Sequence, residues 1–233
     1  MTIIDTRFAG PPSSANGGWA CGTLASHIDG AARVRLRKPP PLDTEMKIER
    51  DGERVSLVHG ETLIGEAWPT ELHLDRPAPV SLDEATEASK RYIGFEQHPY
   101  PTCFTCGTDR QSPDGLRIFP GSVTGRKIVA APWTVPDDLV SGDGKARAEL
   151  MWAALDCPSW FGFGAFNSDH GAILLGELSA RVLRRPEAGQ TGIAYGWAIE
   201  RDGRKIHTAS LLTAADGEPL AEARATWIEL QPR

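Results

Sequence analysis

Apolar and charged residues alternate along a stretch in the first part of the chain. Val34 and Leu36 stand between Arg33, Arg35 and Arg37, and a similar alternation continues on both sides of a turn at 51–52. A period of two is typical of a strand with one buried face. Because tight turns join these segments, we expect an antiparallel meander rather than a parallel sheet.

The last third of the chain has the same pattern in longer segments. Ile193, Tyr195 and Trp197 alternate with small residues, and Asp-Gly turns at 202–203 and 216–217 separate further apolar segments at 206–213 and 221–230. A long strand is also expected at 172–183. This part of the sequence therefore predicts a second antiparallel meander.

Two segments in the first half have the character of helices. The segment Trp19–Ile28 contains no proline and is followed by Asp29-Gly30, which predicts a helix with its cap near Asn16. Residues 81–92 begin with Ser-Leu-Asp-Glu, which predicts a capped and exposed helix. We interpret the second of these helices as part of a linker between two halves.

The second half contains another predicted helix, at 146–155. We expect it to end at Cys157-Pro158, because proline has no N–H to continue the backbone hydrogen bonds. This assignment puts Glu149 in the first turn of the helix and Asp156 at its C-terminal end.

Parts of the sequence occur twice. The segment that begins at Ala32 is similar to the one that begins at Ala180, and Glu49–Gly52 is identical to Glu200–Gly203, at offsets of 148 and 151 residues. A Trp-Ala pair precedes each copy, at 19–20 and 152–153. Two copies do not make a solenoid, which needs at least about three. We therefore expect two like domains, 1–95 and 96–233, that face each other as the halves of a homodimer would.

A helix followed by a long meander resembles the hotdog fold, in which a curled antiparallel sheet wraps around one central helix. Cys103-Phe104-x-Cys106-Gly107, followed by Gly115-Leu116, is similar to the opening of hotdog thioesterases of the phenylacetyl-CoA type. Asn16-Gly17-Gly18 is similar to their His-Gly-Gly, and Asp156 to the acidic residue on their central helix. The resemblance covers nearly the whole chain and implies an α+β fold, a tandem (double) hotdog with one central helix in each half.

The sequence departs from that family pattern in one respect. The family usually has its Gly-Gly pair and its acid on one helix, whereas here Gly17-Gly18 precede the first predicted helix and Asp156 lies on the helix of the second half. Two explanations are open. Either the two halves share one composite site, or the catalytic chemistry has been lost.

Polar residues on a central helix need an explanation, because the sheet should enclose such a helix on nearly all sides. Glu149 and Asp156 are seven residues apart and project in nearly the same direction. A carboxylate there could activate water or attack a thioester directly, and N–H groups at the first helix could stabilise the oxyanion. The catalytic candidates are Asp156, Glu149 and Asn16, and the substrate-binding candidates are Gly17, Gly18, Trp19, His27 and Trp160.

These candidates also have simpler structural explanations. The helix dipole favours Glu149 in a first turn, and Asp156 before Cys157-Pro158 can make local hydrogen bonds. Asn16 is a good helix cap, and a histidine such as His27 is often a partly buried side chain with satisfied hydrogen bonds.

The cysteines raise the question of a metal. Cys103 and Cys106 have the spacing of zinc ligands and His98 is near in the sequence, but a structural zinc site needs four ligands and no second Cys-x-x-Cys follows. We expect a small buried cysteine pair in a turn, with neither a metal nor a cofactor. Four cysteines in 233 residues are not a disulfide framework, which indicates a reducing cytoplasm.

The composition excludes other classes of function. The chain is 40% hydrophobic and 24% charged, as globular proteins are, and its net charge of −6 disfavours nucleic acid as a partner. No apolar run approaches the roughly 20 residues of a membrane-spanning helix, and the N-terminus has no secretion signal. The basic residues 33, 35, 37 and 38 would either meet the phosphates of coenzyme A or face solvent.

These features predict a cytoplasmic hydrolase that acts on acyl-CoA or another acyl thioester, with a homodimer as one possible assembly. The first alternative is a non-catalytic hotdog protein that binds acyl thioesters. The second is a hydratase or dehydratase on the same fold, for which Asp156 and His27 would have to converge.

Overall fold

The computed structural model describes residues 1–230 of the chain. Residues 1–69 contain one central helix, α1, and four strands that follow it. The bounds are α1 Gly17–Ala25, β1 Ala32–Leu36, β2 Lys47–Asp51, β3 Arg54–His59 and β4 Thr62–Pro69. Short 3-10 helices precede α1 at Thr6–Phe8 and follow the second helix at Ile93–Phe95.

The chain from residue 82 onward contains the short helix α2, a longer central helix, α3, and six strands. The bounds are α2 Leu82–Ser89, β5 Gly121–Ser122, β6 Val129–Thr134, α3 Ala148–Gly164, β7 Ile173–Val182, β8 Thr191–Asp202, β9 Lys205–Ala214 and β10 Pro219–Glu229. The predicted strands at 172–183, 206–213 and 221–230 are thus confirmed. No helix within residues 1–230 is long and apolar enough to cross a membrane.

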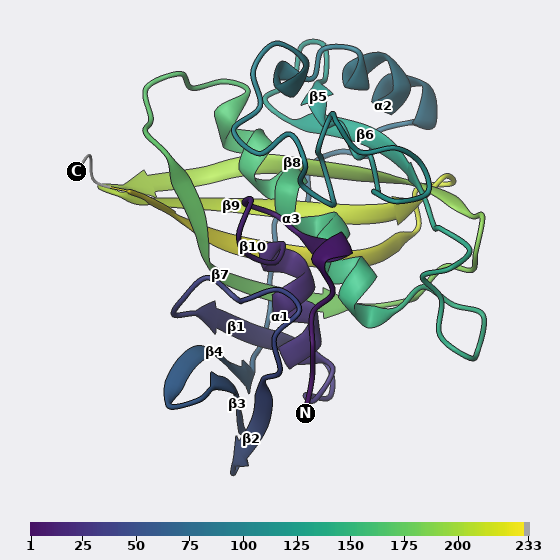
Figure 1. The fold of residues 1–233 in the computed structure, drawn as a ribbon. Coiled ribbons are helices and arrows are strands. Elements are labelled where there is room, and N and C mark those ends of the chain that lie inside the picture. Colours follow the sequence, from purple (N-terminus) through teal and green to yellow (C-terminus); the bar gives the residue numbers. More distant parts are fainter. Residues whose placement is uncertain (231–233) are drawn as a thin grey trace.

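All ten strands form one antiparallel sheet in the order β2-β3-β4-β1-β7-β10-β9-β8-β6-β5. The pairing of β1 with β7, in which Ala32 lies opposite Ala180, joins the strands β1–β4 to the strands β5–β10. Helices α1 and α3 contact each other and lie side by side against the sheet (Figure 1). The architecture is therefore α+β, with two central helices packed on a single curled sheet.

Helix α2, which the sequence predicted as part of a linker, covers the opposite face of the sheet. Its Ala85 and Ala88 pack with Ile193 and Tyr195 of β8, whereas the intervening Ala194 belongs to the core around α3. Because successive side chains of a strand point to opposite faces, α2 and α3 lie on two sides of the same strands. The capping box predicted by the Ser-Leu-Asp-Glu sequence is present, with Ser81 and Glu84 bonding each other's backbone N–H.

Helix α1 is capped by Asn16, as predicted, because the Asn16 side chain accepts a hydrogen bond from the Trp19 N–H. The helix starts two residues earlier than the predicted Trp19 and ends at Ala25, not Ile28. Its glycines allow close contact with α3. A Cβ on Gly18 would lie 2.5 Å from the Trp152 carbonyl oxygen.

The predicted end of the helix in the second half was wrong. Helix α3 runs through Pro158 to Gly164, so that Asp156 lies in its interior and not at its C-terminal end. A proline inside a helix costs about 3 kcal/mol, but every residue from 150 to 164 is buried here, and this packing outweighs that cost. Because Pro158 has no N–H, the carbonyl four residues before it lacks its usual helical donor. The hydroxyls of Thr105 and Ser210 donate to the carbonyls on either side of that one.

Candidate functional site

The site forms where the start of α1 meets the middle of α3. The carboxylate of Asp156 is 3% exposed, and its Oδ2 accepts hydrogen bonds from Asn16 Nδ2 at 2.9 Å and from the Gly18 N–H at 2.8 Å. Asn16 and Gly18 come from one predicted half of the chain and Asp156 from the other. The family's two elements, which the sequence separates by more than a hundred residues, therefore meet in space.

The second oxygen of that carboxylate is left without a partner. Asp156 Oδ1 is buried and accepts no hydrogen bond from residues 1–230. Burial raises the pKa of Asp156 to about 7, against the opposing effect of the hydrogen bonds from Gly18 and Asn16. A buried carboxyl with one held oxygen and one unpaired oxygen can exchange a proton with a bound molecule near neutral pH.

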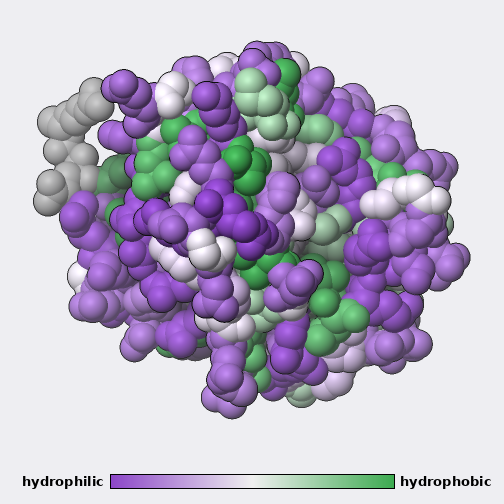
Figure 2. Space-filling view, turned by 90° about the horizontal axis from the view of Figure 1, so that it is seen from below, coloured by the Kyte–Doolittle hydropathy of each residue, from purple (hydrophilic) through white to green (hydrophobic). Residues whose placement is uncertain are grey.

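An apolar cavity of about 260 Å³ lies beside this carboxyl group. Its wall comes from the start of α1, the segments 36–40 and 98–106, helix α3, and strands β7 and β10, and it includes Asn16, Gly17, Asp156, Trp160, Phe161 and Leu175. The outer surface seen in Figure 2 is mostly polar, with apolar residues in small separate areas. The lining of the cavity is instead mostly apolar and contains one acidic group, a combination suited to binding an apolar molecule with a polar reacting centre.

The N–H groups at the start of α1 have different partners. Those of Gly18 and Trp19 are bonded to Asp156 and to Asn16, respectively. The N–H of Gly17 makes no hydrogen bond to the described residues, and Gly17 lines the cavity. A Cβ at Gly17 would lie 2.8 Å from Leu175 Cδ2 and 3.5 Å from Asp156 Oδ2, so a larger residue there would fill space next to the carboxylate.

The structure brings together some of the predicted site residues and leaves others outside the cavity. Asn16, Gly17 and Trp160 line the cavity with Asp156, and Gly18 donates to it. Trp19 is buried and stacks on Phe8, outside the lining.

The remaining two candidates lie further along their helices. Glu149 is in the first turn of α3, forms an ion pair with Arg147 at 3.0 Å, and does not line the cavity. His27 is exposed beyond the end of α1, where its carbonyl accepts a hydrogen bond from Arg50. Asp156 and His27 therefore do not both face the cavity.

The basic residues of the first strand are mostly paired. Arg33 and Arg35 both bond Glu177, and Arg37 forms an ion pair with the buried Glu66. Arg37 and the exposed Lys38 also line the cavity, at the end of β1. Part of the predicted basic face is thus neutralised, and its last two members belong to the cavity wall.

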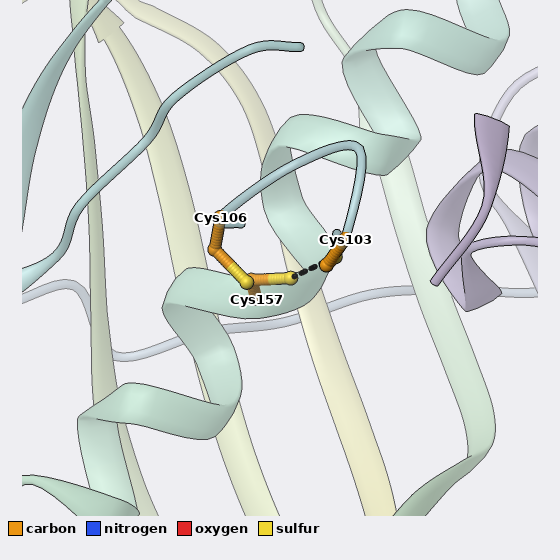
Figure 3. Close-up of side chains that lie close together, drawn as sticks. All are labelled: Cys103, Cys106 and Cys157. Carbon is orange, nitrogen blue, oxygen red and sulfur yellow. Dashed lines mark hydrogen bonds between the residues drawn. The ribbon is translucent and has the colours of Figure 1, made fainter. Parts of the chain in front are cut away.

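Three cysteines lie next to Asp156 on the cavity wall. Cys103 and Cys106, in the loop before β5, meet Cys157, which directly follows Asp156 on α3 (Figure 3). The thiols of Cys106 and Cys157 lower the pKa of Cys103 by hydrogen bonding to its sulfur. The Cys-x-x-Cys spacing pointed to the first two residues, but Cys157 has no such signal, because only the packing of the loop against α3 brings it there.

Solved structures with the same architecture identify the fold. The chain superposes on the tesB protein of Mycobacterium avium subspecies paratuberculosis with a TM-score of 0.61 at 14% identity, over 95% of this chain and 90% of the other. For acyl-CoA thioesterase II TesB2 of Mycobacterium marinum, the TM-score is 0.56 at 13% identity, over 94% and 92%.

A conserved protein with a hot dog fold from Alicyclobacillus acidocaldarius gives a TM-score of 0.58 at 10% identity, over 99% of this chain and 92% of the other. No protein-family model and no curated protein sequence matches this chain. The protein belongs to the α+β class in which an antiparallel sheet curls around central helices. Within that class it has the hotdog fold, as the resemblance in its sequence implied.

Proposed function

We propose that this chain is an acyl-thioester hydrolase of the double-hotdog type, with Asp156 as the carboxylate that drives hydrolysis. The observation that carries the proposal is the arrangement of that carboxylate. Oδ2 is held by Asn16 and Gly18, while Oδ1 is unpaired in a carboxyl that lines an apolar cavity. Such a geometry holds one oxygen in place and leaves the other free to accept a proton or to react.

The order of the strands supports a tandem duplication with halves near 1–95 and 96–233. Read outward from the β1–β7 junction, β1-β4-β3-β2 on one side corresponds to β7-β10-β9-β8 on the other. Ala32 and Ala180, which correspond in the sequence repeat, lie opposite each other at that junction, as a twofold relationship requires. The repeated Asp-Gly turns connect β2 to β3 and β8 to β9.

The chemistry follows from the positions of three groups. Oδ1 of Asp156 removes a proton from water as the water oxygen forms a bond to the thioester carbonyl carbon, or Oδ1 attacks that carbon itself. The unbonded N–H of Gly17, at the N-terminus of α1, donates to the oxyanion. When the tetrahedral intermediate collapses, the C–S bond breaks and the sulfur leaves as a thiolate that takes up a proton. If water attacked, the carboxylic acid remains; if Oδ1 attacked, an anhydride with Asp156 remains, and water then hydrolyses it to the carboxylic acid and free Asp156.

The shape and charge of the site support acyl-CoA as the substrate. The cavity has room for an acyl group but not for a whole coenzyme A ester, so the carrier would remain outside. Arg37 and Lys38 at its wall are suited to binding phosphate groups. The four cysteines are free thiols, which supports a cytoplasmic location.

Thiol release from short, medium, long and aromatic acyl-CoA tests the proposal. Asp156→Asn should lower kcat by about a hundredfold or more, because the amide cannot accept the proton. The control is Glu87→Gln, which neutralises an exposed carboxylate on α2 and should leave kcat unchanged. Equal turnover by wild type and Asp156→Asn would exclude the assigned role, and tight binding of acyl-CoA without thiol release would favour the non-catalytic alternative.

A single turnover in ¹⁸O-labelled water separates the two roles of Asp156. If Asp156 attacks the carbonyl directly, water later opens an anhydride at Asp156, and ¹⁸O can enter the Asp156 side chain. If Asp156 is a general base, ¹⁸O enters only the released acid. Mass spectrometry of the peptide that contains Asp156 measures the difference.

A further inference from the structure

Three sulfur atoms from two distant parts of the chain converge beside the cavity. The Sγ atoms of Cys103, Cys106 and Cys157 all lie within 4.8 Å of one another, and Figure 3 shows Cys103 and Cys106 at the two ends of a tight loop above Cys157. All three are buried and none is in a disulfide. The separation of 3.8 Å between Cys103 and Cys157 is far beyond the roughly 2.05 Å of an S–S bond.

The separation of the Cys103 and Cys157 sulfurs is that of two thiolates around one metal ion. With Zn–S bonds of about 2.3 Å, two sulfurs at tetrahedral positions are about 3.8 Å apart. The distance between Cys103 Sγ and Cys157 Sγ has this value before any ion is considered. Three thiolates form a soft ligand set, which selects zinc over magnesium or calcium.

The loop is built to hold its two cysteines in place. The Gly107 N–H donates to the Cys103 carbonyl at 2.8 Å, and the Tyr92 hydroxyl donates to the Cys106 carbonyl at 3.1 Å. A Cβ at position 107 would lie 2.5 Å from the Cys103 carbonyl oxygen, so that glycine permits this tight turn. The two sulfurs therefore project from a fixed backbone.

The nearby histidine acts on the cluster from outside it. His98 Nε2 lies 3.3 Å from Cys106 Sγ, and His98 Nδ1 accepts a hydrogen bond from the Tyr100 N–H at 2.9 Å. Because Nδ1 is an acceptor, the proton of the neutral ring is on Nε2 and points to the Cys106 sulfur. His98 is thus a donor that orients Cys106, in the way that groups around a metal site fix its ligands.

We propose that Cys103, Cys106 and Cys157 bind one Zn²⁺ ion, with the fourth coordination position facing the cavity. All three cysteines and His98 line that cavity, so a water molecule or a ligand atom can reach the fourth position. The ion would tie the loop to α3 one residue from Asp156. The proposal does not depend on hydrolysis, because it rests on the sulfur positions alone.

Metal analysis of the full-length protein tests the site. The chain is produced with zinc in the medium, purified without chelators and measured by mass spectrometry of the metals. Wild type should contain about one zinc per chain, and Cys103→Ala and Cys157→Ala should each contain less than about a tenth of that. The matched control is Cys21→Ala, which removes the buried free cysteine on α1 and should keep the zinc.

Two further measurements cover variants that fail to fold. Cobalt(II) added to metal-free wild type should give an intense thiolate-to-cobalt absorption band, and zinc should raise the Tm of metal-free wild type. His98→Ala should keep the zinc with weaker binding.

Four outcomes would overturn the proposal. They are a zinc-free wild type with neither a cobalt band nor a Tm shift, copper in place of zinc, equal zinc loss in Cys21→Ala, and complete zinc loss in His98→Ala. None of these measurements depends on thioesterase activity, so the proposed function and this site can fail separately.

Discussion

The backbone N–H of Gly18, the second residue of α1, donates to the carboxylate of Asp156 in the interior of α3 at 2.8 Å. This bond needs the two helices to be unusually close. They can approach because Gly18 presents no side chain to α3, where Trp152 and Asp156 would otherwise meet a Cβ at 2.5 and 2.6 Å. The packing of the helices and the geometry of the site therefore depend on the same glycine.

Gly18→Ala should destabilise the fold and separate the two helices. The added methyl group would press on the Trp152 backbone, which cannot move as a flexible side chain does, and overpacking of this kind costs about 1–3 kcal/mol. Urea unfolding measures the loss. Gly142→Ala is the control, because a Cβ there meets nothing within 4 Å, and its free energy of unfolding should be unchanged. Equal stability of both variants would mean that the helices tolerate a wider separation.

Asn16 has two separable tasks, and two substitutions can divide them. Its Oδ1 caps α1 through the Trp19 N–H, and its Nδ2 holds Asp156 Oδ2. Asn16→Ser keeps a capping oxygen but loses the donor to Asp156, so kcat should fall while stability changes little. Asn16→Ala should lose both the donor and about 1 kcal/mol of cap stability. Thermal unfolding together with thiol-release kinetics checks both expectations, and an unchanged kcat in both variants would contradict the role at Asp156.

Local sequence signals predicted the elements that short-range physics determines. Asn16 before a proline-free apolar segment marked the start of α1, and the Asp-Gly turns at 51–52 and 202–203 marked hairpins that the structure contains. A cap and a tight turn each depend on a few neighbouring residues, so one sequence carries enough information for them.

The same local reasoning failed at Pro158. Proline is a reliable stop only where water can satisfy the freed backbone, and here the helix is enclosed by the sheet. Hydroxyls from Thr105 and Ser210, far away in the sequence, bond carbonyls beside that point. The convergence of Cys157 on Cys103 was beyond prediction for the same reason, since only the packing of a loop on α3 creates it.

Among the ion pairs of residues 1–230, Glu222 on β10 has the most buried carboxylate, and it lies outside the cavity. Its side chain is 2% exposed and bonds both Arg76, at 2.7 Å, and Arg181. Glu222→Ala should cost about 1–3 kcal/mol, because the buried carboxylate loses its charged hydrogen bonds while the two guanidinium groups, each more than a third exposed, remain solvated. Glu218→Ala removes the exposed partner of Arg184 and should cost less than about 1 kcal/mol. Chemical denaturation of both variants gives the comparison, and similar losses would contradict the burial argument.

A substitution of Lys38 should show whether this side chain binds the coenzyme A part or the acyl part of the substrate. It is exposed on the cavity wall at the end of β1, and residues 1–230 provide it with no ion-pair partner, unlike Arg37, which is held by Glu66. Lys38→Ala should therefore raise KM for an acyl-CoA several-fold, because a cation beside the phosphates is lost, with little effect on kcat. The same acyl group on a short thiol without phosphates should show no change in KM. A KM that rises equally for both substrates would mean that Lys38 shapes the acyl cavity and does not bind the carrier. Added salt provides an independent check. Because salt screens the charge of Lys38, it should raise the wild-type KM for acyl-CoA toward that of Lys38→Ala, and it should not raise the KM for the substrate without phosphates.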